Sequence, residues 1–477
     1  MNYESIIGLE VHAQLATKSK MFCACSTAFG NPPNSNICPV CMGAPGALPV
    51  VNFAAVEMAI KAGLAFGSQI QHKSIFARKN YFYPDLSKGY QISQYEFPLC
   101  LGGHLDIPLA SGETKRISIT RIHMEEDAGK LTHDYGHAEK SHVDFNRCGV
   151  GLIEIVSGPD MRTPQEAADY FRKVRQILVY LGVCHGNMQE GNLRCDANVS
   201  IRKVGDTKLG TRTEMKNLNS FKAVERAIAY EINRQIAAVE RGEIIIQETL
   251  LWDDAAGKSA SLRSKEDAHD YRYFPDPDLL PLIVTTDWIE GIRKQLPELA
   301  AAKAARFVRD YGIPEYDAEV LTAERDMALY YEKCIAVYNS PKKISNWIMT
   351  ELLRELKNEG IDITACRITP EHLAQLVTLI DDGIISGKIG KDVFEEMYTT
   401  GHAPAAIIDT KGLKLVSDTS ELDAIIERVL STNQKQVEQY KSGKVAVFGF
   451  LVGQVMKETK GQASPQVVNE LLKKKLS

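Results

Sequence analysis

Ile6-Ile7-Gly8-Leu9-Glu10-Val11-His12-Ala13-Gln14-Leu15 alternates polar and apolar residues over most of its length. Successive side chains of a β-strand point to opposite faces, so a strand here has two faces of different character. The polar face carries Glu10, His12 and Gln14, and the apolar face carries Leu9, Val11 and Ala13. The stretch therefore predicts a strand with one face in a hydrophobic core and the other in a functional site.

Three later stretches, residues 117–130, 151–156 and 193–201, also read as strands that carry carboxylates. Their acids at the matching positions are Glu125, Glu154 and Asp196. Arg121 and His123 share the face of Glu125 by the same alternation. A carboxylate inside an apolar run such as residues 151–156 is costly to bury unless it meets a cation or hydrogen-bond donors. We therefore expect the polar faces of these strands to converge.

The converging set is rich in oxygen ligands and contains one imidazole. Its members are Glu10, His12, Glu125, Glu154, Glu190 and Asp196. Such a set favours a hard cation, magnesium or manganese, over zinc, and without a cation the carboxylates would repel one another. The obvious use is to neutralise phosphate oxygens during phosphoryl transfer. The chain has no Walker loop and no kinase glycine loop, so no motif shows nucleotide binding.

Four cysteines follow the first strand in a short spacing pattern. Cys23 and Cys25 form a C-x-C pair, and Cys38 and Cys41 form a C-x-x-C pair after a loop rich in Asn and Pro. The pattern predicts a structural zinc site with four thiolates over residues 23–41. The alternatives are disulfides, which a reducing cytosol disfavours, and a redox C-x-x-C motif, for which no βαβ setting is visible. The other six cysteines are expected to be small buried hydrophobic residues.

Two aromatic segments mix cations with polar groups. Residues 76–85 include Arg78, Lys79 and Tyr81, and residues 270–278 include Arg272. This composition suits phosphate and base or ribose contacts, although an aromatic surface loop has the same composition. Repeated proline after residue 274 indicates an ordered loop rather than regular structure.

Length and charge define the remaining organisation. A chain of 477 residues exceeds one hydrophobic core, so two or three domains are expected. The net charge is −5, yet residues 431–477 carry eight Lys against three Glu, a net of +5. This basic tail suits a phosphate-seeking arm, and a solvated helical end is the alternative.

No apolar run approaches the ~18 residues of a membrane span and no signal peptide is recognisable, so we expect a cytoplasmic protein without membrane contact.

From about residue 291 the sequence becomes rich in Ala, Leu, Glu and Lys at helical spacing. The expected fold is α+β, with a β-rich domain over residues 1–293, a helical domain over 294–408 and a helical tail over 409–477. No clustered chemistry is visible in the helical region. Lys444, Lys457 and Lys460 are candidate partner contacts, and an ordinary solvated surface is the alternative reading.

Several long motifs make the chain resemble a known family, the B subunits of tRNA-dependent amidotransferases. The resemblance extends over the whole chain, including Gly449-Phe450-Leu451-Val452-Gly453-Gln454 in the tail. The other motifs that carry it are Gly8-Leu9-Glu10-Val11-His12, Arg78-Lys79-Asn80-Tyr81-Phe82-Tyr83-Pro84-Asp85, His123-Met124-Glu125-Glu126-Asp127-Ala128-Gly129-Lys130, Leu193-Arg194-Cys195-Asp196-Ala197-Asn198, Lys216-Asn217-Leu218-Asn219-Ser220-Phe221 and Asp270-Tyr271-Arg272-Tyr273-Phe274-Pro275.

The resemblance implies a cradle-shaped β-rich kinase domain, a helical domain and a tail that grips tRNA, here through Lys444, Lys457 and Lys460. It implies ATP-dependent phosphorylation of the side-chain carboxylate of Glu-tRNA(Gln), and often of Asp-tRNA(Asn), followed by amidation. Ammonia would come from a glutaminase A subunit, and a small C subunit would complete a heterotrimer. A four-cysteine loop occurs in only some members, so zinc rests on the spacing as much as on the family.

The family's magnesium site corresponds here to Glu10, His12, Glu125, Glu154 and either Glu190 or Asp196. The first four are the implied catalytic residues. The implied contacts to ATP or substrate are Arg78, Lys79, Tyr81, Lys216 and Arg272. The chain itself shows no glutaminase nucleophile, which agrees with ammonia from a partner. The rival readings are a non-catalytic tRNA-binding scaffold and a freestanding metal-dependent hydrolase.

Overall fold

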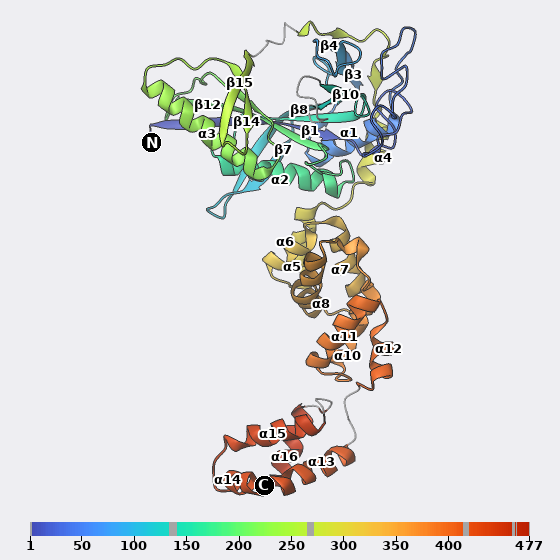
Figure 1. The fold of residues 1–477 in the computed structure, drawn as a ribbon, viewed down its shortest axis with the longest axis vertical. Coiled ribbons are helices and arrows are strands. Elements are labelled where there is room, and N and C mark those ends of the chain that lie inside the picture. The colour runs from blue at the N-terminus through green and yellow to red at the C-terminus, as the bar shows by residue number, and fades with distance from the viewer. Residues whose placement is uncertain are drawn as a thin grey trace. The chain divides into compact units, whose positions relative to one another are not determined.

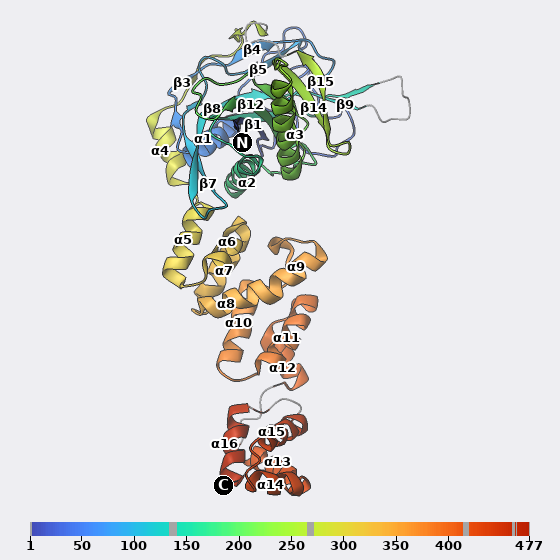
Figure 2. The same cartoon turned by 90° about the vertical axis from the view of Figure 1, so that its left-hand side faces the viewer.

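The chain folds into two compact units, residues 1–299 and 300–477 (Figures 1 and 2). The structure is a computed structural model that describes residues 2–132, 141–264, 271–413, 419–459, 463 and 465–476. The first unit is rich in strands and the second is helical, which confirms the predicted α+β class. The finer domain boundaries at residues 293 and 408 stay predictions.

A ten-stranded mixed sheet forms the centre of the first unit. All of its pairings are antiparallel except the parallel one between β13 and β14. In spatial order its strands are β15 (Lys258–Ser264), β14 (Glu248–Asp253), β13 (Thr213–Lys216), β12 (Leu193–Lys203), β1 (Tyr3–Gln14), β11 (Gly151–Ser157), β8 (Thr114–Glu126), β6 (Cys100–Leu101) and β2 (Gln69–Ile70), with β7 (His104–Pro108) also paired to β8. The first predicted strand therefore lies in the middle of the sheet.

A small three-stranded sheet lies beside the end of β8. Its strands, in spatial order, are β16 (Phe274–Pro275), β4 (Ala77–Asn80) and β5 (Tyr90–Ser93). It is attached to the large sheet by the buried Glu126, whose Oε1 accepts a hydrogen bond from Ile92 N at 2.9 Å. Two further strand pairs are β9 (Lys130–Thr132) with β10 (His142–Asp144), and β3 (Lys73–Ser74) with β17 (Leu282–Ile283).

Helices cover one face of the large sheet (Figure 1). They are α1 (Phe53–Ala65), α2 (Pro164–Tyr180) and α3 (Phe221–Glu240), and α4 (Thr286–Lys294) packs on α1. The apolar residues of β1, Leu9, Val11 and Ala13, are almost completely buried in the core that these helices share. Thr163 caps α2 by accepting a hydrogen bond from Glu166 N, and the proline at the first position of that helix needs no hydrogen-bond acceptor. The polar residues of β1 therefore lie on the uncovered face.

Close packing between α1 and the sheet gives the first prediction. A Cβ added at Gly63 would lie 2.6 Å from Cys100 Sγ and 2.8 Å from Ile70 Cδ1. We expect Gly63→Ala to lower the free energy of unfolding by about 1–3 kcal/mol, because the core must shift to accept the methyl group. Denaturant titration of the protein measures the change.

The control is Gly291→Ala in α4, where an added Cβ would have no neighbour within 4 Å. Alanine there should raise the free energy of unfolding by up to about 1 kcal/mol through helix propensity alone. If both substitutions stabilise the protein, the packing of α1 on the sheet is looser than described.

The second unit is helical in all its described elements and has two hydrophobic clusters. The first cluster joins α5 (Ala300–Tyr311), α6 (Glu315–Thr322), α7 (Arg325–Val337), α8 (Pro341–Trp347), a π-helical turn (Ile348–Leu352), α9 (Leu353–Glu359), a 3-10 turn (Ile363–Ala365), α10 (Pro370–Asp381), α11 (Gly387–Thr400) and α12 (Pro404–Lys411). The second joins α13 (Thr419–Thr432), α14 (Gln434–Lys441), α15 (Val447–Glu458) and α16 (Pro465–Leu476). Among the helices described, none has the length and apolar composition needed to cross a membrane.

Candidate functional site

The register of four neighbouring strands brings the predicted polar residues into rows across the sheet. In the central row, His12 on β1 pairs with Glu154 on β11 and with Arg194 on β12, and Glu154 pairs with His123 on β8. Residues that pair directly across antiparallel strands have side chains on the same face. The uncovered face of the sheet therefore presents a row of imidazoles, a carboxylate and a guanidinium.

The neighbouring rows add the remaining acids. One row pairs Glu10 on β1 with Asp196 on β12, and the other pairs Glu125 on β8 with Leu152 on β11. Each row is two residues from the central one, so these side chains point to the same face. Five of the six predicted oxygen and nitrogen ligands thus lie together on one surface of the sheet.

His12, Glu125 and Glu154 form the tightest group. His12 Nε2 lies 3.2 Å from Glu154 Oε2 and 3.6 Å from Glu125 Oε1. One ligand atom from each of the three residues lies within 4.8 Å of the others. A second imidazole lies beside the same carboxylates, because His123 Nε2 is 3.4 Å from Glu154 Oε2. One imidazole nitrogen and two carboxylate oxygens at this spacing fit a hard divalent cation.

The pKa values of His12 and Glu154 are both shifted by the charges around them. Burial lowers the pKa of His12, but the charge and hydrogen bond of Glu154 outweigh burial and raise the pKa to about 9. Burial raises the pKa of Glu154, whereas the His123 and His12 charges hold it well below its ordinary value. The imidazole and the carboxylate therefore compensate each other's charge, and a divalent cation at the same place would compensate the carboxylates in the same way.

A cavity of about 370 Å³ opens above this cluster. Besides the acids and His12, its lining includes Lys79 and Tyr81 from β4 and the loop that follows it, and Tyr271 and Tyr273 from the segment before β16. The small sheet thus supplies one wall of the cavity and the large sheet supplies its floor. A metal-type cluster under a cavity of this size is a candidate active site.

Lys79 is the cation of the upper wall. Its Nζ lies 4.7 Å from the centroid of the Tyr271 ring and 5.9 Å from that of Tyr81. Within the described part of the chain it forms no ion pair with a carboxylate. Burial lowers the Lys79 pKa, but the negative potential of Tyr273, Glu125 and Glu154 outweighs burial and raises it above its ordinary value. Lys79 is therefore a charged ammonium held by aromatic rings and facing the acids.

Asp196 and Glu10 line the cavity but have protein partners. Lys216 Nζ lies 2.6 Å from Asp196 Oδ2 and 3.5 Å from Glu214 Oε1, and Asn198 donates a hydrogen bond of 2.9 Å to Glu10 Oε1. Lys216, a predicted substrate contact, therefore lies in the cavity with part of its charge already compensated.

The structure places three predicted site residues away from the cavity. Arg78 points to the opposite side of β4 from Lys79, and its guanidinium pairs at 2.9 Å with both Asp276 and Asp278. Arg272 is exposed and has a positive φ of 44°, and Glu190 lies in the turn before β12. None of the three is among the residues that line the described cavities. Arg78 instead fixes the loop after β16, as expected for the strand neighbour of an inward-facing Lys79.

Several cavity residues were not among the predicted site residues. Among them are Tyr95, Arg121, His123, Arg212 and Tyr273. Arg121 and His123 share the strand alternation of Glu125, so that pattern could have identified them. Arg212 lies in a loop between strands, and the sequence gives no local signal for it.

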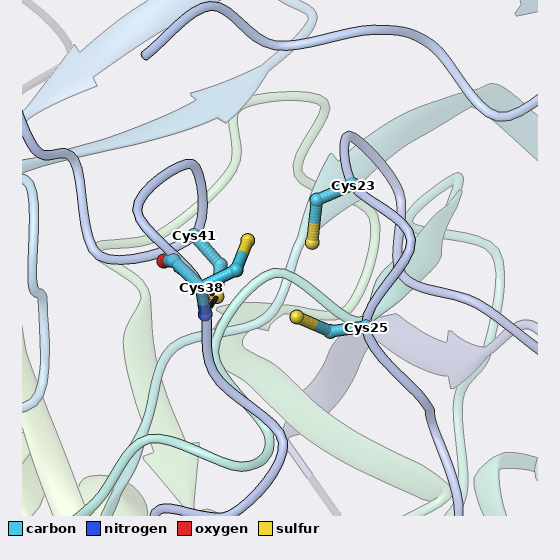
Figure 3. A group of neighbouring side chains, drawn as sticks. All are labelled: Cys23, Cys25, Cys38 and Cys41. Carbon is cyan, nitrogen blue, oxygen red and sulfur yellow. Dashed lines mark hydrogen bonds between the residues drawn. The ribbon is translucent and has the colours of Figure 1, made fainter.

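The four cysteines of the loop after β1 converge (Figure 3). Their Sγ atoms all lie within 4.8 Å of one another. Hydrogen bonds from the Cys23 thiol and from Cys38 N lower the Cys41 pKa to about 4. The fully buried Lys20 places its Nζ 3.6 Å from Cys41 Sγ. Four thiol groups within reach of one ion, with a thiolate already favoured, fit a metal such as zinc.

The tail lysines are the remaining predicted site residues. Lys444 and Lys457 are exposed, and Lys460 lies outside the described residues. Their contacts with tRNA stay a prediction.

The β-rich unit belongs to a known class of catalytic domain. The family model described as the GatB/GatE catalytic domain matches residues 5–290, and the model described as the GatB domain matches residues 329–476. The B subunit of the aspartyl/glutamyl-tRNA(Asn/Gln) amidotransferase is 58% identical to the chain in Geotalea daltonii and 57% in Geotalea uraniireducens, each over 100% of both chains. The relative from Thermodesulfovibrio yellowstonii is 56% identical over 99% of both chains. The chain belongs to the family of tRNA-dependent amidotransferase B subunits.

Proposed function

We propose that this chain activates the side-chain carboxylate of Glu-tRNA(Gln), Asp-tRNA(Asn) or both by ATP-dependent phosphorylation and then converts it to the amide. The relatives' name supplies the class of substrate. The observation that carries the proposal is the meeting of His12, Glu125 and Glu154 with the charged Lys79 across one cavity. This arrangement suits a reaction in which negative charge moves between phosphate oxygens.

The proposed chemistry has two balanced steps. A carboxylate oxygen attacks the γ-phosphorus of ATP, a P–O bond forms, and the bond to the β-phosphate oxygen breaks to release ADP. Ammonia then attacks the carbonyl carbon of the acyl phosphate, inorganic phosphate leaves and the nitrogen loses a proton. The first step is needed because a free carboxylate has oxide as its leaving group, whereas an acyl phosphate has phosphate.

The residues divide this work between the two sheets. His12, Glu125 and Glu154 would hold Mg²⁺, with Glu10 and Asp196 beside them, and the bound cation supplies charge neutralisation for the phosphoryl group. Lys79 holds phosphate oxygens from the opposite wall, and Tyr81 keeps its ammonium in place. Their fixed positions replace the water that would otherwise have to reorganise around the moving charge.

The proposal includes partners. Ammonia comes from a glutaminase subunit of the same complex, with a small third subunit, and the basic tail with Lys444 and Lys457 contacts tRNA phosphates. The four cysteines hold a structural Zn²⁺ that closes the loop between β1 and α1. The complex works in the cytoplasm, where aminoacyl-tRNA is made and used.

The test uses the assembled complex with its glutaminase nucleophile inactivated. It is given ATP, an ammonium salt and either Glu-tRNA(Gln) or Asp-tRNA(Asn). ATP-dependent formation of the amide from ammonium alone supports activation on this chain. If this complex forms no amide from ATP and ammonium, although the unaltered complex forms amide with glutamine, the proposal fails.

Lys79 gives a prediction for the first step. We expect Lys79→Met to lower kcat for amidation by about 100- to 1000-fold, because a preorganised charge at the phosphoryl group is lost. The matched control is Lys73→Met, an exposed lysine on β3, which should leave kcat unchanged. Steady-state kinetics with ammonium as nitrogen donor measure both. Equal rates for Lys79→Met and the control would show that Lys79 holds no reacting phosphate.

A further inference from the structure

Lys20 is completely buried, although lysine is among the residues that are least often buried. Its Nζ donates hydrogen bonds to Asn36 O at 2.6 Å, to Phe145 O at 3.3 Å and to Cys41 Sγ at 3.6 Å. An ammonium has three N–H donors, so these acceptors match its full capacity. The side chain of Lys20 is therefore held in one place beside the cysteine cluster.

The charge of this ammonium has no carboxylate as a direct partner. Among the described residues no acid forms an ion pair with Lys20, and the buried Glu126 pairs with Lys88. Two of the three acceptors of Lys20 are neutral backbone carbonyls. A buried cation is costly without a compensating negative charge, and the sulfur of Cys41 is the acceptor that can carry one.

Lys20 contacts both pairs of cysteines. Its backbone N donates a hydrogen bond of 3.0 Å to the carbonyl of Cys25, in the C-x-C pair. Its side chain reaches Cys41, in the C-x-x-C pair. The two pairs face each other across the space that an ion would fill (Figure 3). One residue therefore connects the two turns that would have to close around a metal.

The charge of a four-thiolate site explains why a cation belongs here. Four thiolates around one Zn²⁺ leave the centre with an excess of negative charge, which is costly away from water. Cys41 is the buried member of the four, and its Sγ accepts a hydrogen bond of 3.2 Å from Cys38 N. A backbone N–H contributes only a dipole, whereas the ammonium of Lys20 contributes a full positive charge to the same sulfur.

We propose that Lys20 is the charge-compensating partner of the zinc centre, and that its ammonium stabilises the bound metal by donating to Cys41 Sγ. This assignment rests on the structural zinc site proposed above. Lys20 contacts a ligand and not the ion, so it is a positioning residue. Through the carbonyl of Phe145 the same ammonium joins the centre to the segment that follows β10. Groups that contact metal ligands in this way commonly set the affinity of a site.

The first experiment measures zinc affinity by competition with a chromogenic chelator. It uses the assembled complex in excess Mg²⁺, so that the carboxylate cluster does not take up zinc. Lys20→Met keeps the apolar stem and removes the ammonium, and it should weaken zinc binding by about 10- to 100-fold. Lys20→Gln removes the charge but keeps N–H donors for the carbonyls, and it should also weaken binding. The matched control is Lys18→Met, an exposed lysine two residues earlier, which should leave the affinity unchanged.

The second experiment replaces zinc with Co²⁺ and reports on the charge beside the sulfur. A positive charge next to a thiolate lowers the energy of its lone pairs, so the sulfur-to-cobalt charge-transfer band lies at higher energy when Lys20 is present. The band should move to lower energy in Lys20→Met and Lys20→Gln and stay in place in Lys18→Met. Either Lys20 variant is sufficient if the other does not fold.

The outcomes separate this assignment from the zinc site itself. Zinc affinity that is unaltered in Lys20→Gln, or a cobalt band that does not move in the Lys20 variants, would show that Lys20 only anchors two carbonyls, and would refute the assignment alone. An unaltered complex that binds neither metal at the four cysteines would refute the zinc site, and the assignment with it. Neither readout depends on amidation.

Discussion

The assembled complex carrying Glu125→Gln together with Glu154→Gln is expected to lose at least about 1000-fold in the rate of ATP-dependent amidation, equivalent to about 4 kcal/mol of transition-state stabilisation. Both carboxylates lie within 3.6 Å of His12 Nε2, so the substitution leaves one imidazole where three metal-type ligands stood. Glutamine keeps the size of the side chain and removes the charge that a divalent cation requires. Single-turnover amidation with ammonium measures the loss.

Affinity for tRNA separates a catalytic role from a scaffold. If the acids serve the chemistry, the double variant should bind tRNA within about twofold of the unaltered complex, because phosphate contacts dominate such affinity. The control is Glu113→Gln with Glu240→Gln, two exposed carboxylates of the same unit outside the cavity. Near-normal amidation by the Glu125 and Glu154 double variant would favour the non-catalytic scaffold.

Cys41→Ala is expected to release the bound metal and to lower the free energy of unfolding of the β-rich unit by about 3 kcal/mol or more, since structural zinc contributes directly to folding. Residues 23–50 contain no described helix or strand, and Cys41 is the buried residue of that stretch. The loop therefore has little buried apolar material of its own to stabilise it. For a unit of this size, the unfolding temperature should fall by roughly 6–12 °C.

Calorimetry together with elemental analysis for zinc measures the effect. The control is Cys366→Ala, a half-buried cysteine of the helical unit outside the cluster, which should change neither the zinc content nor the unfolding of the β-rich unit. Removing zinc from the unaltered protein with a chelator should reproduce the Cys41→Ala result. An unaltered protein that contains no metal and melts at the same temperature as Cys41→Ala would contradict the zinc site.

Strand alternation was enough to predict which faces carry chemistry. The sequence places Glu10 and His12 on one face of a strand because that alternation is local. It does not give the register, and the pairing of His12 with Glu154 depends on the order β12, β1, β11 and β8 in the folded sheet. The four cysteines could be grouped from sequence because the whole cluster lies within 19 residues of chain.

The remaining site residues depend on contacts between distant segments. Either Arg78 or Lys79 could have faced the acids, and the choice was made by Asp276 and Asp278, about 200 residues away, which hold Arg78 on the far side. Glu190 shares a segment with the acids but lies in a turn, where alternation does not apply. Loop residues such as Arg212 reach the cavity only through the tertiary fold.

The pairing of side chains across β12, β1, β11 and β8 also determines where the chain can accept an insertion or a deletion. Deleting one residue of β1 before Leu9 would move each later side chain to the opposite face of the strand. Leu9 and Val11 would then face the cavity, and Glu10 and His12 would face the hydrophobic core. Such a protein would lose both the cluster of His12, Glu125 and Glu154 and the packing of the core. Insertions and deletions should therefore be tolerated in the exposed part of a connecting turn, for example residues 204–208, and should abolish folding within these four strands.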